Sequence, residues 1–364
     1  MYKWAFNKFL SKTDPEKLHK RAIRFLQWAQ KSAISRYAMR RFVPKDHRLN
    51  VNLFNKVFPN PLGIAAGFDK GGTVSQALSC LGFGFTEVGT VTFEHRDGNE
   101  KPRIWREKNN CVRNYMGLPN IGGFEVSTNI NNVRKNGFKG IIGASVSSLG
   151  GHGNLYAEST RLQSLFDQFD FCGIDYITVN ISCPNVEHMY NLEELFRTIR
   201  DFDVFGTNIP IFIKLGPPMR FRESKYNGAK FNNQPYMNVD VLKEIIDFAS
   251  LYNISGIIVL NTLPTIKKGQ VGGRSGTCLK KYGLKAVRTL YKHMNGRMPI
   301  IGVGGISDYN DVLTYIKNGA SLVQLYTSFI YEGPRLPAYI LNDLLLDSDR
   351  NGWKSIQDLV GVWA

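Results

Sequence analysis

The sequence is poor in the residues that build disulfide frameworks and metal sites. Its 364 residues include five cysteines, at positions 80, 111, 172, 183 and 278, an odd number without a Cys-x-x-Cys pair. The six histidines are scattered and lack the spacing of metal ligands. We therefore expect reduced thiols and no structural metal.

Long apolar runs, repeats and acidic residues are also scarce. No stretch approaches the roughly 18 apolar residues of a membrane-spanning helix, and nothing resembles a signal peptide. No repeat or low-complexity tract is present, which argues against a repeat or disordered protein. The 46 basic residues exceed the 30 acidic ones by 16, and residues 1–48 hold thirteen Lys or Arg but only three acidic residues. Most of the excess positive charge therefore lies in this first segment.

The chain does contain a series of short, continuous apolar runs separated mostly by stretches that can hold helices. Such runs are typical of parallel strands that are buried on both faces. The eight runs are "LGIAA" (from 62), "FTEVGTV" (85), "GIIGASV" (140), "YITVNIS" (176), "PIFIKLG" (210), "GIIVLN" (256), "PIIGVGG" (299) and "LVQLYTS" (322). They predict a TIM (β/α)8 barrel over residues 49–364. A doubly wound sheet is disfavoured, because "GVGG" follows the seventh run instead of the first.

The basic segment, residues 1–48, is predicted to be a helical extension. Asp14 and Pro15 form a typical helix start, as a cap and a first-turn residue. Apolar residues follow at helical spacing, with Lys and Arg on the other face: Leu18, Ala22, Phe25, Leu26, Ala29 and Ala33. With Trp4, Phe6 and Phe9 nearby, this pattern suits a membrane surface. A helical lid packed on the barrel fits the pattern equally well, and the two interpretations are compatible.

Polar residues and glycines gather at the carboxyl ends of the predicted strands, the edge of a TIM barrel at which active sites form. They are Lys70, Thr90, Ser145, Asn180, Lys214, Asn261, Gly304 and Gly305. Three loops at this edge, "GVGGIS" (302–307), "LYTS" (325–328) and "GGRSG" (272–276), predict a phosphate site built from backbone N–H groups. We therefore expect a bound mononucleotide.

Several side chains at this edge suit a planar, anionic ligand, although each also has a simpler interpretation. Lys214 would stabilise an anionic reduced ring, or it forms a salt bridge at the rim. Lys70 suits a substrate carboxylate, or it is a surface residue beside Asp69. Four asparagines offer donors and acceptors to a pyrimidine-like ring, and each alone is typical of a turn: Asn114, Asn180, Asn185 and Asn261. Cys183 is a candidate base or nucleophile, but the residues alone favour a packing role.

Together these motifs resemble the dihydroorotate dehydrogenases, flavoproteins of pyrimidine synthesis. The resemblance runs from about residue 13 to the C-terminus. It is carried, in order, by "NPLGIAAGFDKGG", "GFGFTEVGTVT", "PRIWR", "NYMGLPN", "VNISCPN", "GGRSG" and "IIGVGGISDYNDVLTYIKNGASLVQLYTSFIYEGP".

The resemblance implies a reaction and a role for each matching residue. A base removes the C5 proton of dihydroorotate while the C6 hydride passes to N5 of FMN, and orotate is formed. The base precedes the proline of the "SCPN" turn, which makes it Cys183. The implied substrate residues are Lys70, Asn114, Met116, Gly117, Leu118, Asn180, Asn185, Asn261 and Thr262. The implied FMN residues are Ala65, Ala66, Gly67, Thr90, Ser145, Asn180, Lys214, Ser275, Gly276, Gly304, Gly305, Tyr326 and Thr327.

The N-terminal segment is similar to the extension that forms a quinone tunnel in the membrane-associated class 2 enzymes. "DPEKLHKRAIRF" carries this likeness, and the implied tunnel residues are His19, Ala22, Phe25 and Arg106. The expected acceptor is thus a membrane quinone, and the expected location is the cytoplasmic face of the cell membrane, bound peripherally through the N-terminal helices. In a eukaryotic host it would be the mitochondrial inner membrane. No nucleic-acid partner is expected, because the basic segment lacks an RNA-binding signature, and the oligomeric state is not indicated.

Some residues depart from the class 2 pattern. "SCPNV" and "MGLPN" are similar to the soluble class 1 enzymes, since class 2 enzymes usually have serine as the base and phenylalanine where Leu118 stands. Ser145 stands where class 2 enzymes have an asparagine. The class 2 motifs "KIAPD" and "TNTT" are here "KLGPP" and "LNTL", so the residues at Gly216 and Leu260 also differ from class 2. An FMN enzyme that uses fumarate, or acts on another dihydropyrimidine, is therefore the alternative. A basic binding module on an inactive barrel is a third hypothesis, motivated by charge alone.

Overall fold

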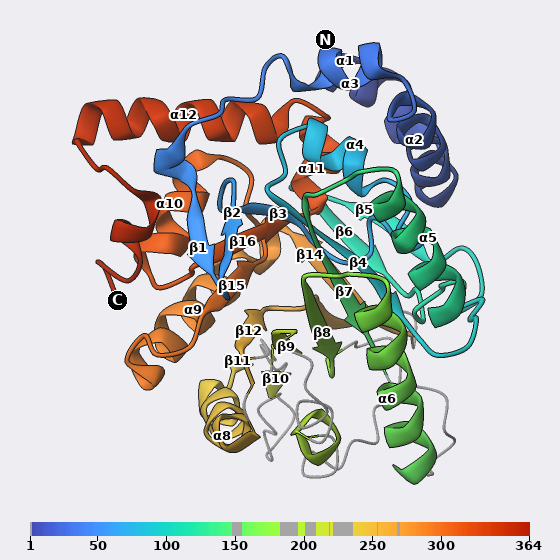
Figure 1. Cartoon of the computed structure of the whole chain (residues 1–364), viewed down its shortest axis with the longest axis vertical. Coiled ribbons are helices and arrows are strands. Elements are labelled where there is room, and N and C mark those ends of the chain that lie inside the picture. The colour runs from blue at the N-terminus through green and yellow to red at the C-terminus, as the bar shows by residue number, and fades with distance from the viewer. Residues whose placement is uncertain are drawn as a thin grey trace, which may run out of the picture.

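Eight parallel strands form a closed barrel at the centre of the molecule (Figure 1). The computed structural model describes residues 2–147, 155–182, 196–200, 209–217, 219–220, 236–252, 254–267 and 270–364. Around the barrel the strands run β12 (Gly256–Val259), β15 (Ile300–Val303), β16 (Leu322–Leu325), β3 (Leu62–Ile64), β4 (Phe85–Val91), β7 (Ile141–Val146), β8 (Tyr176–Asn180) and β9 (Ile211–Leu215). Each lies in one of the eight predicted runs, so the predicted TIM barrel is confirmed.

Aromatic rings fill the amino-terminal end of the barrel. Tyr176 packs against Phe212 with ring centroids 5.3 Å apart. A hairpin of β1 (Val51–Leu53) and β2 (Lys56–Phe58) covers these rings, with Phe54 at 5.5 Å from Phe212. Gly143 leaves room for Tyr176, since a Cβ there would lie 2.1 Å from the tyrosine ring. This end is therefore packed shut, and a ligand site is left to the carboxyl end.

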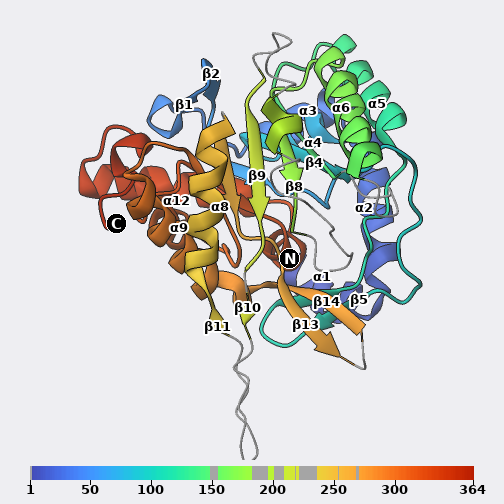
Figure 2. The same cartoon turned by 90° about the horizontal axis from the view of Figure 1, so that it is seen from below.

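The helices lie on the outside of the barrel (Figures 1 and 2). In chain order they are α4 (Ser75–Cys80), α5 (Gly123–Lys135), α6 (Leu155–Phe171), α8 (Val239–Ala249), α9 (Lys280–Met294), α10 (Tyr309–Lys317), α11 (Thr327–Glu332) and α12 (Leu336–Asn351). Short 3₁₀ turns are η1 (Leu10–Lys12), η2 (His47–Leu49), η3 (Ser250–Tyr252), η4 (Thr277–Leu279) and η5 (Ile356–Leu359). A two-stranded pair of β10 (Met219–Arg220) and β11 (Tyr236–Met237) precedes α8.

A second, antiparallel sheet that the sequence analysis did not predict lies at the end of the barrel to which β8 and β9 point (Figure 2). Its strands, in spatial order, are β13 (Leu263–Lys267), β14 (Gln270–Gly276), β6 (Cys111–Asn114) and β5 (Ile104–Glu107). They come from two loops that are far apart in the chain. The sheet therefore places loop residues from both regions beside the carboxyl edge of the barrel.

Three helices precede the barrel: α1 (Tyr2–Lys8), α2 (Pro15–Ala29) and α3 (Ala33–Arg40). The predicted cap is present, because the Asp14 carboxylate accepts a hydrogen bond of 2.8 Å from the Lys17 backbone N–H. Ser32 caps α3 in the same way, at 3.3 Å from Ser35 N–H. The predicted helical extension is thus observed, whereas a domain boundary at residue 48 stays a prediction.

The apolar face predicted for α2 needs a correction. Leu26 and Ala29 are buried, but Ala22 is exposed and Phe25 is 60% exposed. Gln30, which follows α2, donates from Nε2 to the Thr73 carbonyl at 2.6 Å and ties this end of the helix to the barrel. Ala33 does not continue this face, since it begins the next helix. The apolar side chains of α2 therefore divide between the core and the surface.

Candidate active site

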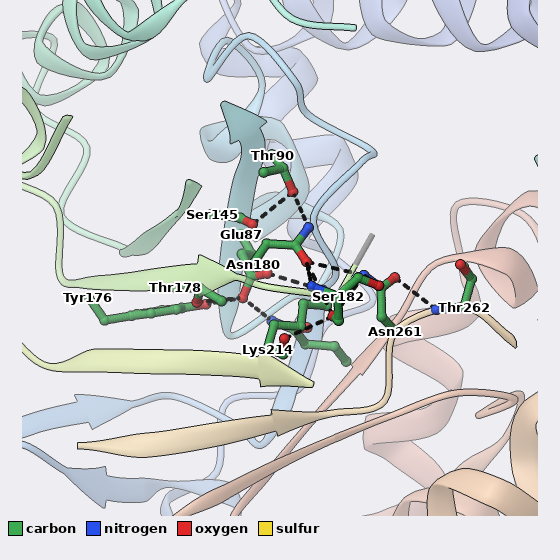
Figure 3. A network of polar contacts seen from close by, with 11 residues as sticks. Glu87, Thr90, Ser145, Tyr176, Thr178, Asn180, Ser182, Lys214, Asn261 and Thr262 are labelled. Carbon is green, nitrogen blue, oxygen red and sulfur yellow. Dashed lines mark hydrogen bonds and ion pairs between the residues drawn. The ribbon is translucent and has the colours of Figure 1, made fainter. Parts of the chain in front are cut away.

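A chain of hydrogen bonds links four strand ends at the carboxyl edge of the barrel (Figure 3). Asn180, the last residue of β8, donates from Nδ2 to Thr90 Oγ1 at 2.9 Å, and Thr90 Oγ1 lies 2.9 Å from Ser145 Oγ. Asn261 Nδ2 lies 3.2 Å from Asn180 Oδ1. Ser182, which follows β8, also donates its backbone N–H to Asn180 Oδ1 at 3.2 Å. The structure thus brings four of the predicted site residues together.

An ion pair lies deeper in the barrel below this network. Lys214, on β9, places Nζ 3.3 Å from Glu87 Oε1 of β4, and both side chains are buried. The Lys214 carbonyl accepts a hydrogen bond of 2.8 Å from Ser182 Oγ, which joins the pair to the network above it. Lys214 therefore has a salt bridge, as one interpretation of the sequence held, but it lies inside the barrel and not at its rim.

Three glycines at the ends of β14 and β15 lie where an added side chain would collide with neighbouring protein atoms. Gly304 and Gly305, which follow β15, have φ of 122° and 74°, values that favour glycine. Gly276 has φ of 100°, and an added Cβ there would lie 2.2 Å from the Asn110 carbonyl oxygen and 3.1 Å from Thr327 Cγ2. Thr327 Oγ1 also donates to Ser275 Oγ at 2.8 Å. The predicted loop 272–276 is instead part of strand β14. Its contact with Thr327, at the start of α11, joins the two segments, which fits the backbone cradle of a phosphate group.

The loop after β3 carries the remaining predicted cofactor residues, Ala65, Ala66 and Gly67. Gly67 donates its N–H to the Gly89 carbonyl at 2.6 Å and has φ of 104°. An added Cβ at Gly67 would lie 3.4 Å from the Tyr326 ring. This loop therefore lies directly against Tyr326, the residue before α11.

The other predicted substrate residues lie on separate loops. Lys70 follows β3 and is half-buried, and Asn114 at the end of β6 donates from Nδ2 to the Gly273 carbonyl at 3.2 Å. Met116, Gly117 and Leu118 follow β6, where Gly117 and Leu118 have positive φ of 68° and 54°. Thr262 donates its N–H to Asn261 Oδ1 at 2.8 Å and joins the main network.

Two predicted site residues, Cys183 and Asn185, lie outside the residues that the structure describes. Most of the polar stretch between residues 220 and 238 lies outside them as well. Ser182, the last described residue before Cys183, is held by Asn180 and by the Lys214 carbonyl.

Of the predicted tunnel residues, His19 and Arg106 make contacts that tie the N-terminal segment to the barrel. The His19 ring lies edge-on to Phe68 at 5.3 Å and 6.5 Å from the Tyr326 ring. Burial, and next the charge of Lys70, lower the pKa of His19 to about 4. Arg106 donates to the carbonyls of Ser11 and Thr13 at 2.9 and 2.8 Å. The other two predicted tunnel residues, Ala22 and Phe25, are exposed on α2, and the Phe25 ring contacts Trp28.

Sequence reasoning missed three polar residues of the site: Glu87, Ser182 and Gln324. Glu87 and Gln324 sit inside apolar strand runs, "FTEVGTV" and "LVQLYTS", and both are fully buried. A charged residue within a continuous apolar run is a signal of a buried, partnered charge, because an unpaired one would be too costly. That signal was available for Glu87.

Comparison with known proteins decides the family. Residues 48–346 match the family described as dihydroorotate dehydrogenase. The chain belongs to this family. A dihydroorotate dehydrogenase oxidises dihydroorotate in pyrimidine biosynthesis, so the protein is an oxidoreductase, and the resemblance found in the sequence is confirmed.

Relatives of this dihydroorotate dehydrogenase match it over nearly its whole length. The protein named dihydroorotate dehydrogenase (quinone) from Nostoc punctiforme is 33% identical over 393 residues, which cover 100% of this chain and 98% of the relative. A protein of the same name from Christiangramia forsetii is 34% identical, covering 92% and 96%. The likeness to the Nostoc protein therefore includes the N-terminal segment.

Solved structures of dihydroorotate dehydrogenases have the same fold. The enzyme from Eimeria tenella in complex with ferulenol superimposes with a TM-score of 0.79 at 25% identity and covers 98% of both chains. Its ligand-free form gives a TM-score of 0.73 at 26% identity. The barrel and its N-terminal helices are thus shared.

Proposed function

We propose that the protein oxidises dihydroorotate to orotate with bound FMN and transfers the electrons to a membrane quinone. The observation that carries this proposal is the network of Asn180, Thr90, Ser145 and Asn261 above buried Lys214 (Figure 3). Amides, hydroxyls and one ammonium group converge on one edge of the barrel, as a flavin and a pyrimidine ring require. The names of the relatives support the quinone as acceptor.

The described residues fit FMN. Gly276, Gly304 and Gly305 would receive the phosphate on backbone N–H groups, and Thr327 with Ser275 would add hydroxyl donors. Thr90, Ser145 and Lys214 would face the ring, where the ammonium group stabilises negative charge. Bound FMN would supply the hydride acceptor.

On the substrate side, asparagines would bind and orient the ring. Asn180 and Asn261 hold each other through an amide contact of 3.2 Å. Asn180 Nδ2 also donates to Thr90, and Asn261 Oδ1 accepts from the Thr262 N–H, so both amides are fixed in orientation. Lys70 and Asn114 would bind from the two flanking loops. Cys183 would accept the C5 proton, because a thiolate forms more readily near neutral pH than an alkoxide.

The N-terminal helices would hold the protein on a membrane surface and receive the quinone. Four exposed aromatic side chains support this proposal, together with the basic residues between them: Trp4 on α1, Phe9 directly after it, and Phe25 and Trp28 on α2. Within the described residues, no helix is both long and apolar enough to span a bilayer. His19, on α2, has its ring 6.5 Å from the Tyr326 ring, and the quinone would approach the flavin here.

The test is anaerobic mixing of the purified protein with dihydroorotate while the flavin absorbance is followed. Bleaching that a quinone reverses and fumarate does not is the expected result. Reversal by fumarate alone would move the enzyme to class 1 chemistry, which the "SCPNV" motif motivates. Flavin that dihydroorotate fails to bleach would refute the proposed substrate.

A further inference from the structure

Glu87 occupies an unusual place for a carboxylate, in the middle of β4 inside the barrel. Its side chain is 0% exposed. Oε2 accepts hydrogen bonds from Gln324 Nε2 at 2.8 Å, Thr178 Oγ1 at 3.3 Å and Tyr176 Oη at 3.4 Å. The other oxygen, Oε1, is left to Lys214 Nζ at 3.3 Å (Figure 3). Four donors from three other strands thus fix one carboxylate.

This arrangement fixes Lys214 in turn. Its side chain is 6% exposed, and a long, flexible lysine in such a place needs a partner of opposite charge. Because neutral donors hold Oε2, the Glu87 carboxylate cannot rotate freely away from Nζ. The ammonium group is therefore held at one point below the network of Asn180 and Thr90.

We propose that Glu87 is a positioning residue that acts through Lys214, holding its ammonium group under the flavin ring and offsetting part of its charge. This inference rests on the proposed function, since it needs FMN at the carboxyl edge. Lys214 alone would favour the anionic reduced flavin strongly. Paired with Glu87 it favours that form less, so the pair sets how readily the flavin is reduced.

The sign of the effect of removing Glu87 follows from this charge balance. In Glu87→Gln the shape and one acceptor remain, but the negative charge is lost and the Lys214 charge is no longer offset. The equilibrium between oxidised and reduced flavin should shift at least tenfold toward the reduced form. For a two-electron couple this equals a rise of about 30 mV in midpoint potential.

The experiment is a reductive titration of the purified holoenzyme against a reference dye at pH 7, with the flavin content of each variant measured first. Thr178→Val and Tyr176→Phe are the matched controls, because each removes one neutral donor to Glu87 and leaves the ion pair in place. Both controls should keep the equilibrium within threefold of wild type. Lys214→Met should shift it in the opposite direction from Glu87→Gln.

An unchanged potential in Glu87→Gln that holds one flavin per chain would overturn the inference. Should Glu87→Gln not fold, Glu87→Asp takes its place: it keeps the charge but withdraws it from Nζ by one methylene, and about a threefold shift toward reduced flavin is expected. No shift in that variant also overturns the inference. A wild-type protein without flavin would instead count against the proposed function, so the two failures are distinguishable.

Discussion

At the scale of single residues, His19 couples the stability of the fold to pH. Burial, and next the Lys70 charge, lower its pKa from 6.5 to about 4, so the folded protein keeps this ring neutral. The unfolded chain takes up a proton at His19 as the pH falls below 6.5, whereas the folded chain does so only near pH 4. The free energy of unfolding is therefore expected to fall as the pH is lowered from 6.5 to about 4, by at most about 1.4 kcal/mol per pH unit.

The variant His19→Gln isolates this contribution. Urea unfolding at pH 7 and at pH 5 should show a smaller loss of stability for the variant than for wild type. His47→Gln is the matched control, because it makes the same change at an exposed histidine. Equal losses in wild type and His19→Gln would show that the ring is not kept neutral by burial.

Residues at strand ends could be predicted, whereas residues inside strands were missed. Asn180, Lys214 and Asn261 were found because a TIM barrel places the carboxyl ends of all strands at one edge, so position in the run is sufficient. Glu87 lies four residues before the end of β4, in the body of its strand. Whether such side chains point into the barrel depends on strand tilt and register, which the apolar pattern does not contain.

At the scale of elements, parallel strands were predictable and antiparallel ones were not. The barrel strands form continuous apolar runs because helices and barrel interior bury both faces. The strands β5, β6, β13 and β14 carry charged residues and glycines, such as Arg113, Glu107 and Gly272. They form two hairpins, β5–β6 and β13–β14, and the pairing of β14 with β6 joins segments that are far apart in sequence. No local period identifies them, so only the folded chain shows that they pair.

An ion pair joins helix α2 to the segment before β5: Glu16 of α2 pairs with Arg103. Arg103 donates to both oxygens of Glu16, at 3.1 and 2.8 Å, and Arg103 is 6% exposed. The Arg103 guanidinium and its hydrogen bond hold the pKa of Glu16 below its usual range. In Glu16→Gln the charged hydrogen bonds are lost, at a cost of about 1–3 kcal/mol.

Hydrogen exchange measures this directly, because the amides of α2 should exchange faster in Glu16→Gln than in wild type while those of β4 stay unchanged. Lys17→Gln is the control, since it removes an exposed charge one residue away. Equal exchange of α2 in Glu16→Gln and Lys17→Gln would mean that the apolar contacts of Leu26 and Ala29 hold the helix without this ion pair.

At the scale of the whole molecule, charge and exposed aromatic groups coincide in the N-terminal segment. Residues 1–48 carry thirteen Lys or Arg, and Phe25 and Trp28 on α2 are 60% and 65% exposed with their rings 5.8 Å apart. Figure 1 shows α1, α2 and α3 together on one side of the barrel and α8 on the other. Aromatic groups beside basic ones match the boundary between lipid headgroups and acyl chains.

The variant Phe25→Ser/Trp28→Ser should therefore lose at least about tenfold in its partition to anionic phosphatidylglycerol vesicles, which equals about 1.4 kcal/mol. Sedimentation of the holoenzyme with vesicles measures this, and anaerobic bleaching of the flavin by dihydroorotate, which needs no quinone, reports whether the fold is intact. Phe171→Ser/Leu251→Ser, which removes two similarly exposed apolar groups outside this segment, should partition like wild type. If both double variants lose the same affinity, general hydrophobicity drives the binding and the N-terminal helices are not the membrane surface. If neither double variant loses affinity, charge alone drives the binding to vesicles, and neutral phosphatidylcholine vesicles should then bind none of the proteins.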